Sequence, residues 1–471
     1  MKTTIKYYGY DTLLQPTDWR AAAAVVGLCK YFDHFRIEYK ILYNVDEKPE
    51  NYIHGFDGII YKSDSITEEK YLDFVESYFE KYMTHSTILS ILGNDEFSDE
   101  QIKMVNDLVK SKTVLKDLLG KTKFDGTNKA VFISTIEENR EEIIKNIFKN
   151  GNNLYKNYCN EHLIFTDDNS TCRLRGYNVD NDRKTSILGF CFSKESFDAN
   201  DILEFDFIPF AFSNPDMRET YFVNNNFSVE SLVNTNRAFS EQLSNTEGKG
   251  DKNKLLLVLQ NSKDYISYDV EIISKSQRKL QSKSYYETFF VRLDRLKLLR
   301  NLSEKMLNYY YSTNNYTLTL QSEVYYRCLN NVLLDDVILR MLKLYFIDTN
   351  NRRKIRANTD VLIQINVSWK GIVNMDKLYS AKKCGNKVSQ KLISLNSENT
   401  IISYRHKLTS SLCVRDYDRV KDILLKLYDC VGIDFPFMYD FFENAEENKD
   451  VVYMFVSGLY VSSERNNENK D

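Results

Sequence analysis

Hydrophobic and polar residues follow two different patterns along the chain. In the first 250 residues, strand-like and helical stretches are mixed: residues 5–10 resemble a strand, and residues 36–43 alternate with the period of two that strands require. Between them, a segment that follows Pro16 is apolar on most sides, which predicts a buried helix through about residue 35. Helical spacing predicts further helices over residues 67–92, 98–119 and 137–158.

After these helices come short strand-like runs, and from residue 288 onward the pattern is almost wholly helical. The change predicts an α+β fold, with a mixed α/β amino-terminal domain, then linking strands and helices, then an α-helical carboxy-terminal bundle. Polar stretches at residues 244–253 and 349–354 are typical of exposed loops, and they indicate the boundaries between the three parts. The three predicted parts are residues 1–250, 251–350 and 351–471. The strand-like runs are Ser186–Ser193, Phe205–Phe212, Leu255–Gln260 and Tyr265–Ser274.

Composition excludes a disordered chain, because 42% of the residues are hydrophobic and 13% are aromatic. The net charge of −4 hides a strong internal contrast. Residues 275–410 hold 24 Lys and Arg against 10 Asp and Glu, a net charge of +14 in a chain whose other parts are acidic. We call this segment the basic belt. It favours a polyanionic partner such as nucleic acid, and a surface of merely uneven charge is the alternative.

The sequence lacks the patterns of exported and membrane proteins. Its first ten residues are polar and aromatic where a secretory signal has an apolar core. The longest small and apolar run, Ala21–Cys29, is far shorter than the roughly 18 to 20 residues of a membrane span. The eight cysteines are dispersed, which argues against a disulfide scaffold and a zinc site of paired cysteines. We therefore expect a cytoplasmic protein that has no membrane partner, no metal and no cofactor.

A search for catalytic motifs finds no glycine-rich phosphate loop and no zinc-binding His-Glu-x-x-His. One partial motif remains, in which Asp33 precedes Glu38 and Lys40. These three residues resemble a nuclease site in which two carboxylates hold Mg²⁺ beside a lysine. The aspartate is only five residues upstream, and Glu-x-Lys on an alternating strand is common by chance. The sequence therefore predicts no catalytic residue, and a metal-dependent nuclease is the alternative.

A turn-rich loop over residues 119–129 combines glycines with lysines and an asparagine. Glycine lets a ligand approach the backbone closely, lysine contacts phosphate, and asparagine can pair with a base edge. We expect this loop to contact duplex DNA, and an ordinary solvated loop is the alternative. The residues assigned to the duplex are Lys121, Lys123, Asn128 and Lys129.

Clusters of Lys and Arg in the basic belt predict contacts with a nucleic-acid backbone. Such side chains hold phosphates and position a strand without specifying its sequence. Three of the lysines recur every four residues and therefore share one face of a predicted helix. Another helix, over residues 420–431, turns its hydrophobic face inward. The residues assigned to the strand are Arg352, Arg353, Arg356, Lys383, Lys387, Lys391 and Arg405.

Several stretches of the sequence resemble one protein family. Thr17–Arg20 with the following Ala- and Val-rich helix, Phe207–Phe212, and a helical end that includes Tyr404–Leu408 are similar to the large subunits of type I CRISPR interference complexes, above all those of subtype I-B. The resemblance implies a non-enzymatic subunit that recognises a protospacer-adjacent motif in double-stranded DNA, stabilises the R-loop and recruits a helicase-nuclease. The carboxy-terminal helices resemble the small subunit of such a complex.

The same resemblance implies the partners: guide RNA, target double-stranded DNA, the other backbone and small subunits of the complex (Cascade), and the helicase-nuclease. The amino-terminal domain is then expected on the side of the guide-RNA handle and the protospacer-adjacent motif, and the basic belt on the guide RNA or the displaced DNA strand. The sequence lacks the paired Cys-x-x-Cys of some relatives, which removes a zinc-ribbon role. A helical protein that binds an acidic protein partner, without a nucleic-acid role, is a further alternative.

Overall fold

The computed structural model divides into two compact units. The N-terminal unit comprises Met1–Val258 and Ser262–Phe290, and the C-terminal unit comprises Leu259–Asn261 and Val291–Asp471. The residues that the structure describes are 1–43, 52–151, 154–166, 173–174, 201–213, 219–224, 228–245, 258–259, 262, 266, 268–277, 284–300, 307, 309–313, 316–371 and 375–461.

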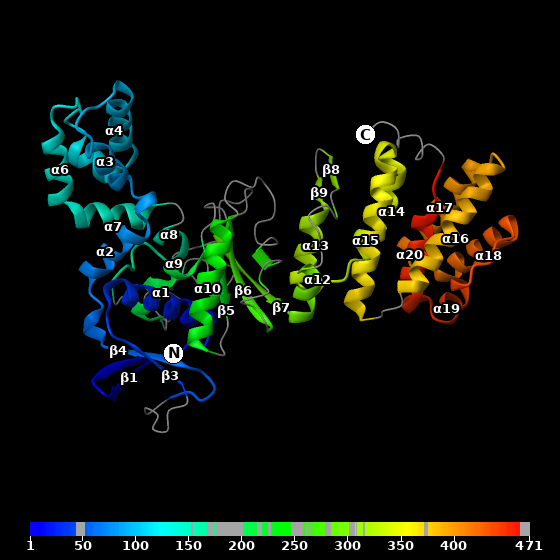
Figure 1. Cartoon of the computed structure of the whole chain (residues 1–471), viewed down its shortest axis with the longest axis horizontal. Coiled ribbons are helices and arrows are strands. Elements are labelled where there is room, and N and C mark those ends of the chain that lie inside the picture. The colour runs from blue at the N-terminus through cyan, green and yellow to red at the C-terminus, as the bar shows by residue number, and fades with distance from the viewer. Residues whose placement is uncertain are drawn as a thin grey trace, which may run out of the picture. The chain divides into compact units, whose positions relative to one another are not determined.

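A small antiparallel sheet and one buried helix begin the N-terminal unit (Figure 1). The strands lie in the order β1-β2-β4-β3, and each neighbouring pair is antiparallel. Helix α1 follows β2, and its N-cap Asp18 accepts a hydrogen bond from the backbone N–H of Ala21. Most of α1 is buried, which confirms the prediction from its apolar sequence. The bounds are β1 Lys2–Tyr7, β2 Tyr10–Leu14, α1 Trp19–Phe35, β3 Lys40–Leu42 and β4 Gly58–Tyr61.

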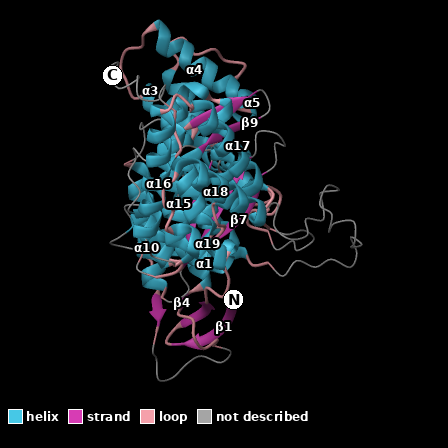
Figure 2. Cartoon of the chain, turned by 90° about the vertical axis from the view of Figure 1, so that its right-hand side faces the viewer, coloured by secondary structure: helices cyan, strands magenta, loops and turns pink. Residues whose placement is uncertain are grey.

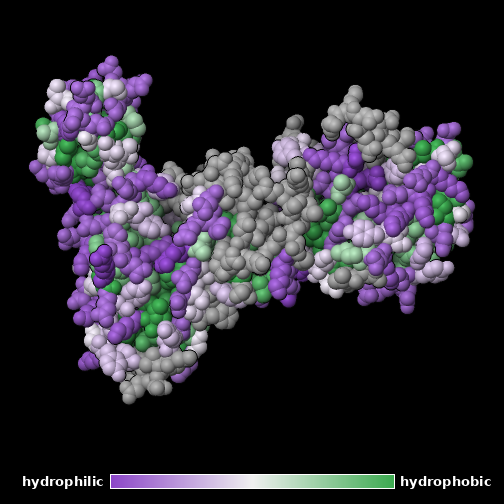
Figure 3. Space-filling model, in the orientation of Figure 1, coloured by the Kyte–Doolittle hydropathy of each residue, from purple (hydrophilic) through white to green (hydrophobic). Residues whose placement is uncertain are grey.

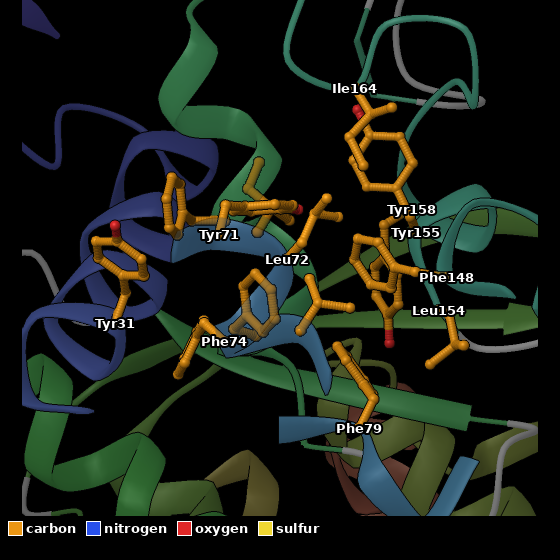
Figure 4. Close-up of a cluster of buried hydrophobic side chains, with 14 of the residues drawn as sticks. Tyr31, Tyr71, Leu72, Phe74, Phe79, Phe148, Leu154, Tyr155, Tyr158 and Ile164 are labelled. Atoms are coloured by element: carbon orange, nitrogen blue, oxygen red, sulfur yellow. The ribbon is translucent and has the colours of Figure 1, made fainter. Parts of the chain in front are cut away.

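Helix α1 packs directly on the backbone of a short helical segment, which consists of the 3-10 helix η5 (Leu203–Phe207) and α9 (Ile208–Ala211). At this contact, a Cβ added to Gly27 would lie 2.1 Å from the carbonyl oxygen of Phe207, so glycine is required there. Aromatic side chains fill the core beside the contact (Figure 4). They are Tyr71, Phe74, Phe79, Phe148, Phe207 and Phe210.

Residues 205–211 are helical, so the strand predicted over Phe205–Phe212 is wrong. Pro209 stands in the first turn of α9, where its missing N–H leaves no helical hydrogen bond unmade. The segment is apolar on every side, and periodicity cannot distinguish a buried strand from a buried helix in so short a run. The strand predicted over residues 5–10 also ends early, because Tyr8 and Gly9 form a turn at positive φ.

A group of helices follows β4. A 3-10 turn at Glu80–Tyr82 divides the helix predicted over 67–92, and Lys112 divides the one predicted over 98–119. Ser98 and Gln101 form a capping box at the start of α4. The bounds are α2 Glu68–Tyr78, α3 Thr84–Leu92, α4 Asp99–Ser111, α5 Thr113–Leu119, α6 Lys129–Glu138, α7 Arg140–Asn150 and α8 Tyr155–Tyr158.

A second small sheet, in the order β5-β6-β7, completes the N-terminal unit together with α10. The side-chain amide of Asn236 on α10 bonds both the N–H and the carbonyl of Val223 in β5, which fixes the helix to the sheet. Tyr265–Ser274 overlaps β6, whereas Ser186–Ser193 and most of Leu255–Gln260 lie outside the described residues. The bounds are β5 Glu219–Asn224, α10 Val229–Ser244, β6 Val270–Gln277 and β7 Ser284–Val291.

In the described part of the C-terminal unit, helices are interrupted by an antiparallel hairpin of β8 and β9 (Figure 2). This hairpin was not predicted, although its Tyr and Thr residues favour strands. The apolar face predicted over residues 420–431 is buried on α18, apart from Tyr428, which is exposed. The bounds are α12 Leu293–Arg300, β8 Tyr310–Thr313, β9 Tyr316–Thr319, α13 Leu320–Leu329, α14 Asp335–Ile347, α15 Arg352–Lys370, α16 Met375–Ser394, α17 Glu398–Cys413, α18 Tyr417–Val431, α19 Phe437–Glu443 and α20 Ala445–Gly458.

Helix α20 is the centre of this bundle. Its residues 449–458 are all buried, and α14, α15, α16, α17 and α19 each pack against it. Against α16 the two backbones meet: a Cβ added to Gly385 would lie 2.4 Å from the carbonyl oxygen of Phe455, and one added to Gly458 would lie 2.6 Å from that of Lys382. The predicted α+β fold is confirmed, with small sheets in the first part of the chain and helices dominating the second.

We expect Gly27→Ala to destabilise the N-terminal unit. The added methyl group must displace the Phe207 backbone, and overpacking costs about 1 to 3 kcal/mol or more, against about 1 kcal/mol that alanine gains over glycine in a helix. Denaturant unfolding should therefore show a lower midpoint. Gly93→Ala is the matched control, because its Cβ would approach backbone oxygens only at 3.2 and 3.7 Å. An unchanged midpoint for Gly27→Ala would contradict the close contact.

Candidate nucleic-acid interface

Many cations of the basic belt are held by partners inside their own unit. The ammonium of Lys382 lies 2.6 Å from a carboxylate oxygen of Asp360, and that of Lys370 lies 2.6 Å from Asp450. In the N-terminal unit, Lys275 is buried with its ammonium over the ring of Tyr158. The net charge of the segment therefore overstates the charge that its surface presents to a partner.

Arg405 is the clearest case, because it is fully buried. Its guanidinium donates hydrogen bonds to the carbonyl oxygens of Val456 and Leu459 at the end of α20, and it lies 3.5 Å from the ring centroid of Tyr345 on α14. The residue thus joins α17 to two other helices of the bundle. The assignment of Arg405 to a nucleic-acid strand requires a side chain on the surface. The structure buries this side chain, so it cannot contact a nucleic acid.

Arg352 and Arg356 lie half-buried at the start of α15. Nε of Arg356 donates to the carbonyl oxygen of Ser457 at 2.7 Å, and Nε of Arg352 donates to that of Tyr345 at 3.1 Å. Each guanidinium also lies 4.9 Å from an aromatic ring centroid, that of Tyr460 or of Tyr345. These contacts stabilise the bundle and leave only part of each guanidinium for a phosphate.

The lysines on α16 behave differently. Lys383, Lys387 and Lys391 are all exposed, and they lie on the side of the helix away from Gly385 and α20. The ammonium of Lys391 donates to the carbonyl oxygen of Val431 at the end of α18, so this lysine also closes a helix terminus. Lys383 and Lys387 form no ion pair with any described residue. Hydrophilic residues cover much of the face of this unit that Figure 3 shows.

The turn-rich loop is organised by its own polar groups. The Asn106 side chain bonds the N–H and the carbonyl of Phe124 at 2.9 Å each, which anchors the loop to α4. Asp125 accepts hydrogen bonds from the side chain and backbone of Thr127, and these lower the pKa of its carboxyl group. Gly126 has a φ of +90°, which a residue with a side chain rarely adopts.

Two of the four residues assigned to the duplex take part in this organisation. The amide of Asn128 donates to the carbonyl oxygen of Lys123 at 2.9 Å and accepts from the N–H of Asp125 at 3.3 Å. Lys129 donates to the carbonyl oxygen of Asn94 at 2.8 Å. Lys121 and Lys123 are exposed. Lys121 and Lys123 can therefore meet a phosphate, and Asn128 is held in place by its two bonds with one amide N–H and one Oδ1 lone pair to spare.

The residues of the nuclease-like partial motif have separate partners. Glu38 accepts a hydrogen bond from the hydroxyl of Tyr10 at 2.9 Å, and Asp33 accepts one from Tyr39 at 3.2 Å. Desolvation and the bond to Glu38 raise the pKa of Tyr10. Among the described residues, no group of three or more His, Cys, Asp and Glu side chains could hold a metal ion. No described helix has the length and apolar character of a membrane span.

Two exposed lysines extend the set beyond the assigned residues. Lys354 lies on α15 and Lys407 on α17, and both side chains reach solvent. Neither stands at a regular spacing from the α16 lysines, so no periodic signal singled them out. The signal in the sequence is their place in the clusters of the basic belt, Lys354 between Arg353 and Arg356 and Lys407 two residues after Arg405.

The comparisons with known proteins concern the chain as a whole. The family model described as CRISPR-associated protein Csx8 matches the chain over residues 10–252 and 244–459. These two stretches cover nearly all of its length. No curated protein and no solved structure matches the chain.

We expect Arg405→Met to destabilise the C-terminal bundle by about 3 kcal/mol. Two hydrogen bonds from a charged donor are lost, each contributing about 1.5 to 3 kcal/mol, and the carbonyl oxygens of Val456 and Leu459 stay buried without them. Thermal or denaturant unfolding measures the loss. Lys407→Met, which changes an exposed cation on the same helix, is the control and should change stability little. If the two variants unfold alike, Arg405 does not hold the bundle.

Proposed function

The chain belongs to the CRISPR-associated Csx8 family, and from this we propose that it is a non-catalytic large subunit of an RNA-guided surveillance complex. In this role it recognises the protospacer-adjacent motif in double-stranded DNA, stabilises the R-loop and recruits a helicase-nuclease. Family membership supports the CRISPR-associated role itself. The observation that carries the finer proposal is the row of exposed lysines on α16.

The lysines on α16 fit a strand that is held by its backbone. On an α-helix, residues four apart are separated by about 6 Å along the axis, so the row offers ammonium groups at a regular spacing. Lysine contacts to phosphates supply affinity without reading bases. This is the contact required of a protein in a complex where the guide RNA reads the sequence. We assign Lys383 and Lys387 to the guide RNA or the displaced DNA strand. Arg353, which is also exposed, is assigned to the same strand.

The loop at residues 119–129 is the proposed contact with the duplex. Lys121 and Lys123 are its exposed cations and would hold phosphates near the protospacer-adjacent motif. The hydrogen bonds of Asn106 and Asp125 hold the loop in one shape before any ligand binds, which reduces the entropy lost on binding. Asn128 keeps its second amide N–H and a second lone pair on Oδ1, so it could meet a base edge while both internal bonds remain.

In this role the protein binds nucleic acid and docks the helicase-nuclease, and the helicase-nuclease cleaves the strand. The partners proposed are the guide RNA, the target double-stranded DNA, the other backbone and small subunits, and the helicase-nuclease. The separate partners of Asp33 and Glu38 support the absence of a nuclease site at that place, because such a site needs both carboxylates on one metal ion.

Reversing two charges on α16 tests the strand contact. The variant Lys383→Glu with Lys387→Glu should bind single-stranded nucleic acid more weakly, and the slope of log affinity against log salt should fall by about 1.4 units, about 0.7 for each lost phosphate contact. Binding measured by fluorescence anisotropy over a series of salt concentrations gives both quantities. Lys391 is left intact, because it also bonds Val431.

Lys426→Glu is the matched control for that variant. Lys426 is an exposed lysine on α18, among acidic residues, and its reversal should change neither the affinity nor the slope. If the α16 variant keeps the wild-type affinity and slope, α16 is a solvated face. The Lys426 variant changes the net charge by half as much as the α16 variant, so if it loses half as much free energy of binding, binding follows net charge and no specific surface.

Glu38→Gln tests the absence of catalysis. The amide keeps an acceptor for the hydroxyl of Tyr10 but loses the charge that a metal ion needs. We expect the isolated protein to show no Mg²⁺-dependent cleavage of DNA or RNA, and the variant to match it in nucleic-acid binding and in stability. Cleavage by the wild-type protein that disappears in an equally stable Glu38→Gln variant would establish the nuclease alternative.

A further inference from the structure

A pocket in the N-terminal unit is lined by side chains that none of the surfaces above uses. Its volume is about 200 Å³. Tyr78 and Tyr82 line it from the end of α2 and the following 3-10 turn, Ser213 from the segment after α9, and Ser240 and Ser244 from the last turns of α10. Three parts of the chain that are far apart in sequence thus form one polar and aromatic cavity.

The volume limits the ligand to a single ring system. Pockets for drug-sized ligands typically have about 300 to 1,000 Å³, whereas a cavity of about 150 Å³ accepts benzene. At about 200 Å³, this pocket has room for a ring the size of a nucleobase and little else. A sugar and phosphate attached to that ring would remain outside.

The aromatic wall offers ring surface with a cation beside it. The hydroxyl of Tyr78 donates to the carbonyl oxygen of Phe210 at 3.0 Å and accepts from Lys30 at 3.1 Å, so it is the ring that Tyr78 offers to a ligand. Lys81 is exposed, and its ammonium lies 5.4 Å from the ring centroid of Tyr82. Unstacked bases stack on aromatic side chains and phosphates pair with lysine, so the two together fit one nucleotide of a single strand.

The serine wall offers hydrogen-bond acceptors. Ser240 donates its hydroxyl proton to the carbonyl oxygen of Asn236 at 2.9 Å, so Ser213 is the donor in the 2.8 Å bond between their hydroxyls. Ser244 donates to the carbonyl oxygen of Ser240 at 3.0 Å. All three hydroxyl protons are used within the protein, and each oxygen keeps at least one lone pair. A ligand that supplies the donors leaves all three of these bonds in place.

We propose that this pocket binds one unstacked nucleobase that carries an exocyclic amino group, with the ring against the tyrosines and the amino group donating to the serine hydroxyls. Adenine, cytosine and guanine have such a group. Uracil and thymine offer one donor, N3–H, between two carbonyl oxygens, and the carbonyl that stands in place of the amino group would face the serine oxygens as an unpaired acceptor. This site goes beyond the function proposed above, because the α16 lysines hold a strand by its phosphates whereas the pocket selects a base.

The test compares two single-stranded DNA octamers with the full chain. One carries a single central cytosine among thymines, and the other carries uracil at that position. The two bases have the same ring shape and differ in the amino group and the adjacent ring nitrogen. Fluorescence anisotropy should show about tenfold tighter binding of the cytosine octamer, because a buried acceptor without a donor weakens binding by a factor of roughly 5 to 150.

Variants in the pocket show whether it causes the preference. Ser213→Ala with Ser244→Ala removes two acceptors and should abolish the preference, so that the cytosine and uracil octamers bind with equal affinity. Ser77→Ala, an exposed serine of α2 that does not line the pocket, is the matched control and should keep the preference. Tyr82→Leu should weaken binding of the cytosine octamer about tenfold through the loss of stacking.

The outcomes separate this proposal from the one for α16. Equal affinity for the two octamers overturns the base pocket, and the α16 proposal still stands if Lys383→Glu with Lys387→Glu weakens binding of both. A cytosine preference that persists in the double serine variant also overturns the pocket, because the selection then takes place elsewhere. If neither octamer binds at all, both proposals fail together.

Discussion

The backbone contact between α16 and α20 is the constraint on which the C-terminal unit depends. Gly385 and Gly458 let the two helices approach until their backbones touch, and a side chain at either position would force them apart. Successive residues on an α-helix are about 100° apart, so Lys383 and Lys387, two positions on either side of Gly385, point about 200° away from the contact. The contact that buries α20 therefore also sets the direction of the exposed lysines.

The sequence predicted those elements whose apolar residues mark one face or cover all sides of a long helix. Helix α1 and the buried face of α18 are of this kind. Two of the errors have a common physical cause, because they concern short elements that take their conformation from distant neighbours. Residues 205–211 have no polar face to give a period, and the hairpin of β8 and β9 depends on pairing between strands of four residues each.

The candidate surface was predicted only in part, for a related reason. A regular spacing of lysines identified the exposed row on α16, because periodicity within one helix is a local property. Whether a single arginine faces solvent is not local. The acceptors of Arg405 are the carbonyl oxygens of Val456 and Leu459, about fifty residues later in the chain, and a count of charges cannot reveal them. The sequence did not predict the serine and tyrosine pocket for the same reason, since its walls come from three separate segments.

The place of α20 in the order of elements has a consequence for synthesis. The helices that pack around it, α14 to α17 and α19, leave the ribosome before it does. Until it follows, Arg405 has neither of its carbonyl acceptors, and the apolar faces of its neighbours remain uncovered. The nascent bundle therefore passes through a stage in which it is open to aggregation and to capture by chaperones. In the N-terminal unit, α1 waits in the same way for residues 203–211, on whose backbone it packs.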